Sequence, residues 1–174
     1  MNNSPIKVLV VDDHPVVREG LKLMLSVTPD LQWVGQAENG AEAIELCAAF
    51  KPDVILMDLI MPEVDGPAAT RAIRQQFPSV QVVALTSFDD KELVQEVLQA
   101  GAISYVLKNA SMEIITAVIR DAYAGQTTLT ATALQALLSA RTPDVFEEEL
   151  TAREKEVLQL MAEGLKNADI AEKL

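Results

Sequence analysis

Five short apolar runs, each followed by a stretch with helical spacing, limit the folds open to this chain more than any other feature. The runs at 8–11 and 54–57 are unbroken and aliphatic, which is typical of strands buried on both faces of a sheet. The run around Trp33 and Val34 is more polar, as expected near a sheet edge. The remaining runs lie at 80–85 and 103–107, and the helical stretches at 17–25, 44–48, 69–77, 94–98 and 115–122. This alternation predicts an α/β fold, a five-stranded parallel sheet covered on both sides, over about residues 6–125.

Length, charge and hydrophobicity limit the kinds of function that this chain can have. With 174 residues, 49% of them hydrophobic, the chain can bury one full domain and has room for a smaller piece. Its formal net charge of -12 repels nucleic acid and phosphate unless a local patch or a metal reverses the field. No apolar run approaches the roughly 18–20 residues of a membrane span, and Cys47 is the single cysteine. We therefore expect a cytoplasmic protein without membrane contact.

Three segments are predicted along the chain. Residues 1–125 form the α/β domain. Residues 126–149 are predicted to be a linker with one helix, because Pro143 and a run of glutamates interrupt the apolar pattern. Residues 150–174 again have helical spacing and are expected to be all-α.

Polar side chains follow four of the predicted strands, at the edge where open parallel sheets bind ligands. They are Asp12, Asp13, Asp58, Thr86, Ser87 and Lys108. Each alone has an ordinary structural role: an acidic pair caps a helix, a lone Asp sits in a turn, and a lone Lys lies on the surface. Their convergence at one edge favours a shared site.

Three converging carboxylates repel each other unless a hard divalent cation joins them, and oxygen ligands favour Mg²⁺. An ammonium group opposite the metal suits a transferring phosphoryl group, since both cations neutralise its oxygens. Asp58 is the expected nucleophile, forming an acyl phosphate, because it stands alone after the central strand. Thr86 can donate its hydroxyl to a phosphoryl oxygen, and Ser87 is small enough to leave the site open.

These segments closely resemble the receiver domain of two-component response regulators. The resemblance rests on Asp12-Asp13-His14-Pro15, Met57-Asp58-Leu59-Ile60-Met61-Pro62, Asp65-Gly66, Leu85-Thr86-Ser87 and Ser104-Tyr105-Val106-Leu107-Lys108. It implies a flavodoxin-like sheet of order 2-1-3-4-5 and a sensor histidine kinase that phosphorylates Asp58.

The resemblance also implies a role for each site residue. Asp13 ligates Mg²⁺ directly, Asp12 largely through water, and Ile60 through its backbone carbonyl. Lys108 pairs with the phosphoryl group, and Thr86 and Tyr105 form the switch pair, Tyr105 taking the space that Thr86 leaves.

Asn109 and His14 flank the predicted site along the chain. Asn109 stands where many receivers have a proline after the lysine, so this sequence departs from the family pattern there. His14 is expected at the surface of a helix start rather than as a metal ligand or a phosphohistidine.

The C-terminal segment begins with a capping box, Thr151 followed by Glu154. The sequence from Leu150 to Ala171 resembles the NarL/LuxR-type DNA-binding domain. This resemblance implies transcription control by a homodimer formed on phosphorylation. The recognition helix of that family would lie after Leu174. Residues 144–174 carry nine acidic and four basic groups, a net of -5, so we expect promoter DNA to bind only the complete protein.

Two other function classes fit the sequence less well. An aspartyl-phosphate phosphatase needs a second Asp two residues after its nucleophile, and Ile60 stands there, so no enzyme activity is expected beyond slow self-dephosphorylation. Ile60 and Phe88 are expected to slow that hydrolysis by hindering water. The alternative to transcription control is a receiver that acts only through protein contacts.

Overall fold

A single parallel sheet organises the described part of the chain. The computed structural model describes residues 4–87 and 91–128. Its five strands are β1 (Ile6–Val11), β2 (Leu31–Ala37), β3 (Val54–Asp58), β4 (Gln81–Thr86) and β5 (Ser104–Leu107). They pair in parallel in the order β2-β1-β3-β4-β5, which confirms the predicted fold and the edge position of the polar strand around Trp33.

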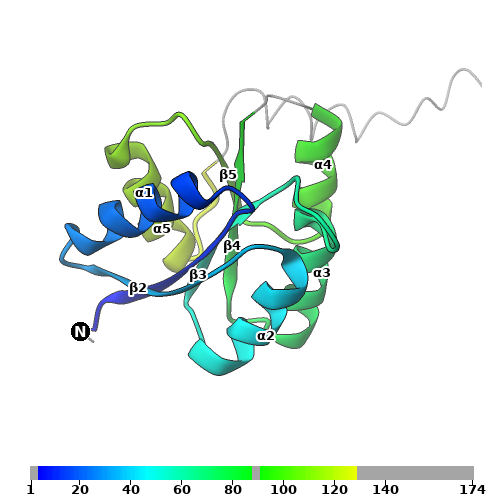
Figure 1. Cartoon of the computed structure of the whole chain (residues 1–174), viewed down its shortest axis with the longest axis horizontal. Helices are drawn as coiled ribbons and strands as arrows, with labels where there is room; N and C mark the ends of the chain where they lie inside the picture. The colour runs from blue at the N-terminus through cyan, green and yellow to red at the C-terminus, as the bar shows by residue number, and fades with distance from the viewer. Residues whose placement is uncertain (1–3, 88–90, 129–174) are drawn as a thin grey trace, which may run out of the picture. The chain divides into compact units, whose positions relative to one another are not determined.

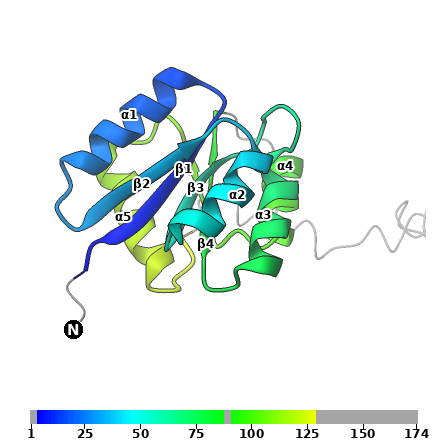
Figure 2. The same ribbon diagram turned by 60° about the horizontal axis from the view of Figure 1, so that its bottom comes forward.

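Five helices cover the two faces of this sheet (Figures 1 and 2). They are α1 (Pro15–Ser26), α2 (Gly40–Phe50), α3 (Gly66–Gln76), α4 (Lys91–Gln99) and α5 (Met112–Tyr123). Helices α1 and α5 pack on one face, and α2, α3 and α4 pack on the other. None of the helices in the described ranges is long and apolar enough to cross a membrane.

The central strand explains why the sheet has two cores. Every residue of β3 is buried, and successive side chains point to opposite faces. Ile55 and Met57 enter the core beneath α2, α3 and α4, whereas Val54 and Leu56 enter the core beneath α1 and α5. Cys47 is fully enclosed in the first core, where burial raises the pKa of its thiol to about 11. It therefore fills space as a protonated side chain, as predicted.

Local signals set where α3 begins, close behind Asp58. The Asp65 side chain accepts a hydrogen bond from the Ala68 N–H at 2.8 Å, which caps the helix. Gly66 follows at the first helical position. A Cβ atom there would lie 2.2 Å from the Asp58 carbonyl oxygen and 2.7 Å from the Leu59 Cα atom. Only glycine lets α3 approach the end of β3 this closely.

The chain turns back on the domain after α5. Gly125 has a left-handed φ of 74°, and the chain then runs past the end of α5. The Thr128 N–H donates to Ser104 Oγ at 3.0 Å, and the Thr128 hydroxyl donates to Asp121 Oδ2 at 2.8 Å. The part of the predicted linker from 129 to 149 and the predicted all-α segment at 150–174 lie outside the described residues.

Candidate functional site

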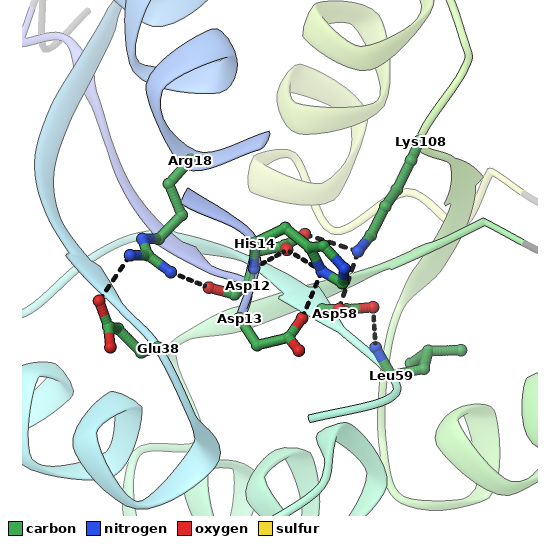
Figure 3. A network of polar contacts seen from close by, with 8 residues as sticks. All are labelled: Asp12, Asp13, His14, Arg18, Glu38, Asp58, Leu59 and Lys108. Carbon is green, nitrogen blue, oxygen red and sulfur yellow. Dashed lines mark hydrogen bonds and ion pairs between the residues drawn. The ribbon is translucent and has the colours of Figure 1, made fainter. Parts of the chain in front are cut away.

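The carboxyl ends of β1, β3 and β5 bring three side chains into contact. Asp12 follows β1 and is 0% exposed, and Asp58 ends β3 and is 4% exposed. The Lys108 ammonium, just after β5, lies 2.7 Å from Asp12 Oδ2 and 2.8 Å from Asp58 Oδ2 (Figure 3). The chain thus places one cation between two buried carboxylates from separate strands.

The acidic residues of this site bring together carboxylate oxygens that can still bind a cation. Ligand atoms of Asp12, Asp13, His14 and Asp58 all lie within 4.8 Å of one another. Asp12 Oδ2 and Asp13 Oδ1 are buried, and each has one nitrogen beside it, Lys108 Nζ at 2.7 Å and His14 Nδ1 at 2.6 Å. Clustered carboxylate oxygens with spare lone pairs fit a hard divalent cation such as Mg²⁺.

Burial and charge shift the ionisation of both central groups. Burial raises the pKa of Asp58, and the nearby Asp12 charge adds to this, while Lys108 opposes it. Burial disfavours the Lys108 ammonium, but the Asp12 and Asp58 carboxylates outweigh it, so the pKa of Lys108 is also raised. Lys108 is therefore a permanent cation at neutral pH, and the Asp58 carboxylate is kept in an unfavourable, poorly hydrated setting.

A small open cavity of about 160 Å³ lies over the Asp58 carboxylate. Its lining residues are Asp13, His14, Asp58, Ile60, Thr86, Ser87 and Lys108. The Ile60 residue is 61% exposed at its rim, whereas Thr86 is buried. Among the predicted site residues only Asp12 and Tyr105 stay outside the lining. Tyr105, on β5, is buried in the core beneath α2, α3 and α4, and β4 lies between its strand and β3.

His14 is exposed at the N-cap of α1, as predicted. Its N–H donates to Asp12 Oδ1 at 2.9 Å, which helps to orient that carboxylate. Its ring also contacts Asp13, a contact that the sequence did not predict.

An ion pair between Arg18 and Glu38, which lies behind the acidic cluster, was not predicted from the sequence. Arg18 is buried in α1, where its guanidinium donates to the Asp12 carbonyl oxygen and to Glu38 Oε1, each at 2.6 Å (Figure 3). One signal was available: Arg18, Leu21 and Leu25 are spaced i, i+3 and i+7, so a charged residue occupies the apolar face of the helix.

Comparison with known families identifies the domain that carries this site. Residues 8–120 match the family described as the response regulator receiver domain. The chain belongs to the response regulators. Residues 148–174 of this response regulator match a second family, the bacterial regulatory proteins of the luxR family. The two matches together make it a NarL/LuxR-type response regulator that controls transcription.

Relatives of this response regulator match most of its length. It is 40% identical to the transcriptional regulatory protein LiaR of Bacillus subtilis over 173 residues, which cover 97% of this chain and 82% of LiaR. Among solved structures, a LuxR-family two-component response regulator from Aurantimonas sp. SI85-9A1 has a TM-score of 0.72 at 30% identity, covering 79% of this chain and 99% of that one. A structure of two RcsB dimers bound to two parallel DNAs has a TM-score of 0.69 at 25% identity, covering 98% and 83%.

Proposed function

We propose that Asp58 accepts a phosphoryl group from the histidine of a sensor kinase, and that this modification controls transcription through dimerisation and a C-terminal helix-turn-helix. The observation that carries the proposal is the Asp58 carboxylate at the base of an open cavity, with Lys108 Nζ 2.8 Å away and two further aspartates beside it. A nucleophile, a fixed cation and spare metal ligands are the parts that phosphoryl transfer needs.

In the proposed transfer, one bond to phosphorus forms and one breaks. An Asp58 carboxylate oxygen attacks phosphorus, a P–O bond forms, and the P–N bond to the kinase histidine breaks. The bonding pair returns to the imidazole nitrogen. Lys108 stays protonated and neutralises charge on the phosphoryl oxygens, while the Thr86 hydroxyl turns to donate to one of them. The exposed, small Ser87 leaves room for the donor.

Mg²⁺ would be held by Asp12, Asp13, Asp58 and the backbone carbonyl of Ile60. When bound, it supplies positive charge that stabilises the equatorial oxygens of the transferring group. The clustering of the Asp12, Asp13 and Asp58 carboxylates within 4.8 Å supports this assignment. Ile60 can neither donate nor accept a proton through its side chain, which supports a phosphoacceptor with slow self-dephosphorylation rather than a turning-over phosphatase. Phe88, the other residue expected to slow hydrolysis, lies outside the described residues.

The switch is proposed to run through Thr86 and Tyr105. These residues lie on the paired strands β4 and β5, where Ala84 is the register partner of Tyr105. Tyr105 is buried here, which is the inner position that the proposal assigns to the phosphorylated state. Phosphorylation would then shift the population of an arrangement that the unmodified chain can already adopt.

The output is proposed by likeness to the relatives. The DNA-bound RcsB dimers support a homodimer that binds promoter DNA, with the receiver at 1–125, the linker at 126–149 and the DNA-binding part from 150. Action on promoter DNA would place the protein in the cytoplasm. A receiver that acts only through protein contacts is the alternative, and a gel shift of promoter DNA with the phosphorylated complete protein separates the two.

The test is the intact mass after incubation with acetyl phosphate and Mg²⁺, with oligomeric state measured in parallel by light scattering. The native chain should gain one phosphoryl group and dimerise. Asp58→Asn should do neither, whereas Asp30→Asn, which changes an exposed carboxylate at the other end of α1, should behave as the native chain. An Asp58→Asn protein that still gains the group would refute the assignment.

A further inference from the structure

A buried arginine behind the acidic cluster has no part in the chemistry proposed above. Arg18 of α1 is only 4% exposed. Its Nη1 donates to the backbone carbonyl of Asp12 at 2.6 Å, and its Nη2 donates to Glu38 Oε1 at 2.6 Å. In Figure 3 the guanidinium lies between Asp12 and Glu38, on the side of Asp12 away from Lys108. Arg18 therefore joins α1 to the end of β1 and to the loop after β2.

The acceptor on Asp12 is the carbonyl of the peptide that links Asp12 to Asp13. The rest of Asp12 is also held: its N–H donates to the Ala37 carbonyl at 3.1 Å, and its Oδ1 accepts from the His14 N–H at 2.9 Å. The bond from Arg18 completes this set and fixes the plane of the Asp12–Asp13 peptide. That plane sets the direction in which both carboxylates leave the chain.

Glu38 balances the charge that this arrangement introduces. Its side chain is 69% exposed, so the pair has one buried and one hydrated partner. Arg18 can therefore act as a hydrogen-bond donor beside the cluster while its positive charge is compensated from the solvent side. A lysine cannot replace it, because a single ammonium nitrogen cannot reproduce the rigid fork that reaches two acceptors at once.

We propose that Arg18 is a positioning residue for Mg²⁺ binding, which aims the Asp12 and Asp13 carboxylates, and that Glu38 compensates its charge. This inference rests on the metal site of the proposed function. Groups that orient metal ligands from behind typically contribute about 10–100-fold to metal affinity.

The direct test is the Mg²⁺ affinity of Arg18→Gln, measured by titration calorimetry without any phosphoryl donor. We expect a loss of about tenfold or more. Arg18→Lys should recover only part of it. Thermal denaturation of the metal-free proteins checks that each variant is folded. A folded Arg18→Gln protein with native affinity overturns the proposal.

Arg74→Gln is the matched control. Arg74, in α3, also donates to backbone carbonyls, those of Pro78 at 2.8 Å and of Val80, in the loop after that helix. Its loss should lower thermal stability and leave the Mg²⁺ affinity unchanged. If Arg74→Gln weakens Mg²⁺ binding as much as Arg18→Gln does, the effect is general destabilisation and the positioning role is refuted.

Two further variants, Asp13→Asn and Glu38→Gln, separate a failure of the metal site from a failure of the positioning role. Asp13→Asn should lose Mg²⁺ binding; if it does not, the proposed metal site is wrong and the inference falls with it. If Asp13→Asn loses binding while Arg18→Gln keeps it, only the positioning role fails. If Arg18→Gln does not fold, the Mg²⁺ affinity of Glu38→Gln is measured instead. We expect this affinity to fall about threefold, which is the size of an exposed ion-pair contribution. An unchanged Mg²⁺ affinity of Glu38→Gln overturns the inference.

Discussion

Lys108 bonds two buried carboxylates, so its charge serves both the stability and the chemistry of the site. Its ammonium lies within 2.8 Å of both Asp12 and Asp58. Buried charges are tolerated when they are paired, and removal of one partner leaves the others uncompensated. The same cation that compensates the two carboxylates is thus the one that would meet the phosphoryl oxygens.

Replacing Lys108 by Ala should lower the free energy of unfolding of the metal-free protein by about 3 kcal/mol, because Asp12 and Asp58 lose their cation. Mg²⁺ should restore more stability to this variant than to the native chain, since the ion supplies the missing charge. Urea denaturation with and without Mg²⁺ measures both effects. Lys22→Ala, which removes an exposed lysine near Glu19, should cost under about 1 kcal/mol and show no extra response to Mg²⁺.

The raised pKa of Asp58 predicts a pH dependence with a definite sign. Between its ordinary pKa of 3.8 and the raised folded value, the folded chain binds the proton more tightly than the unfolded chain does. The contribution of Asp58 to stability therefore falls as pH rises through this window. Metal-free Asp58→Asn should melt above the native chain at neutral pH, and the difference should shrink as pH falls through the window from the raised folded pKa to 3.8.

Asp30→Asn provides the opposite sign in the same measurement. A hydrogen bond from Arg120 lowers the pKa of Asp30, so its contribution is present above its ordinary pKa and is lost in acid. This exposed pair should contribute at most about 1 kcal/mol. If the melting difference of Asp58→Asn had the same sign and pH dependence as that of Asp30→Asn, the burial argument for Asp58 would be wrong.

At the scale of the elements, the close approach of α3 to β3 supports the position of Asp58. The first residue of α3, Gly66, donates its N–H to the Leu59 carbonyl at 3.1 Å. The atoms that a side chain would meet there belong to the backbone and cannot rotate away. The helix and the phosphoacceptor strand are consequently held in one arrangement.

Gly66→Ala should destabilise the fold by about 2–3 kcal/mol, because the backbone around Asp58 must shift to admit a methyl group. Gly20→Ala in α1 is the matched control. Beyond the adjoining backbone of α1, no atom lies within 4 Å of its Cβ position, so this variant should gain about 0.5–1 kcal/mol from higher helix propensity. Urea denaturation compares the two, and equal stability of both variants would contradict the contact.

The elements were predictable because periodicity reports burial directly. The unbroken run at 54–57 became the central strand, and the polar run at Trp33 became the edge. The gathering of polar residues at the strand ends followed from parallel topology alone. The Arg18–Glu38 pair did not: the spacing of Arg18 with Leu21 and Leu25 indicates a buried charge, but it does not identify Glu38, 20 residues away, as the partner. Likewise, Asp65 and Gly66 indicate a helix start, but the contact of Gly66 with Asp58 depends on how α3 crosses the sheet.

At the scale of the whole molecule, the two family matches follow one another along the chain, at 8–120 and 148–174. The residues after α5 join the two matched parts along the chain. Thr128 is bonded to Ser104, the neighbour of Tyr105 on β5. The segment that follows α5 is thus attached to β5, the strand that carries the proposed switch residue.

Ser104→Ala should release this attachment. Loss of the Oγ acceptor, worth about 1 kcal/mol, should speed amide exchange at Thr128 roughly fivefold. Thr128→Val keeps the N–H donor and removes only the hydroxyl bond to Asp121, so its amide should exchange more slowly than in Ser104→Ala. Hydrogen exchange followed by NMR measures both, and an unchanged rate in Ser104→Ala would rule out the attachment.

This attachment also has a consequence for protein engineering. Helix α5 ends at Tyr123 with Ala124 as its C-cap, and a splice made at Gly125 would separate Thr128 from the receiver. A chimaera that carries a different output module should keep the native sequence through Thr128, so that the grafted module inherits the same anchored starting point. Grafts joined earlier would start from an untethered end and respond less to the state of Asp58.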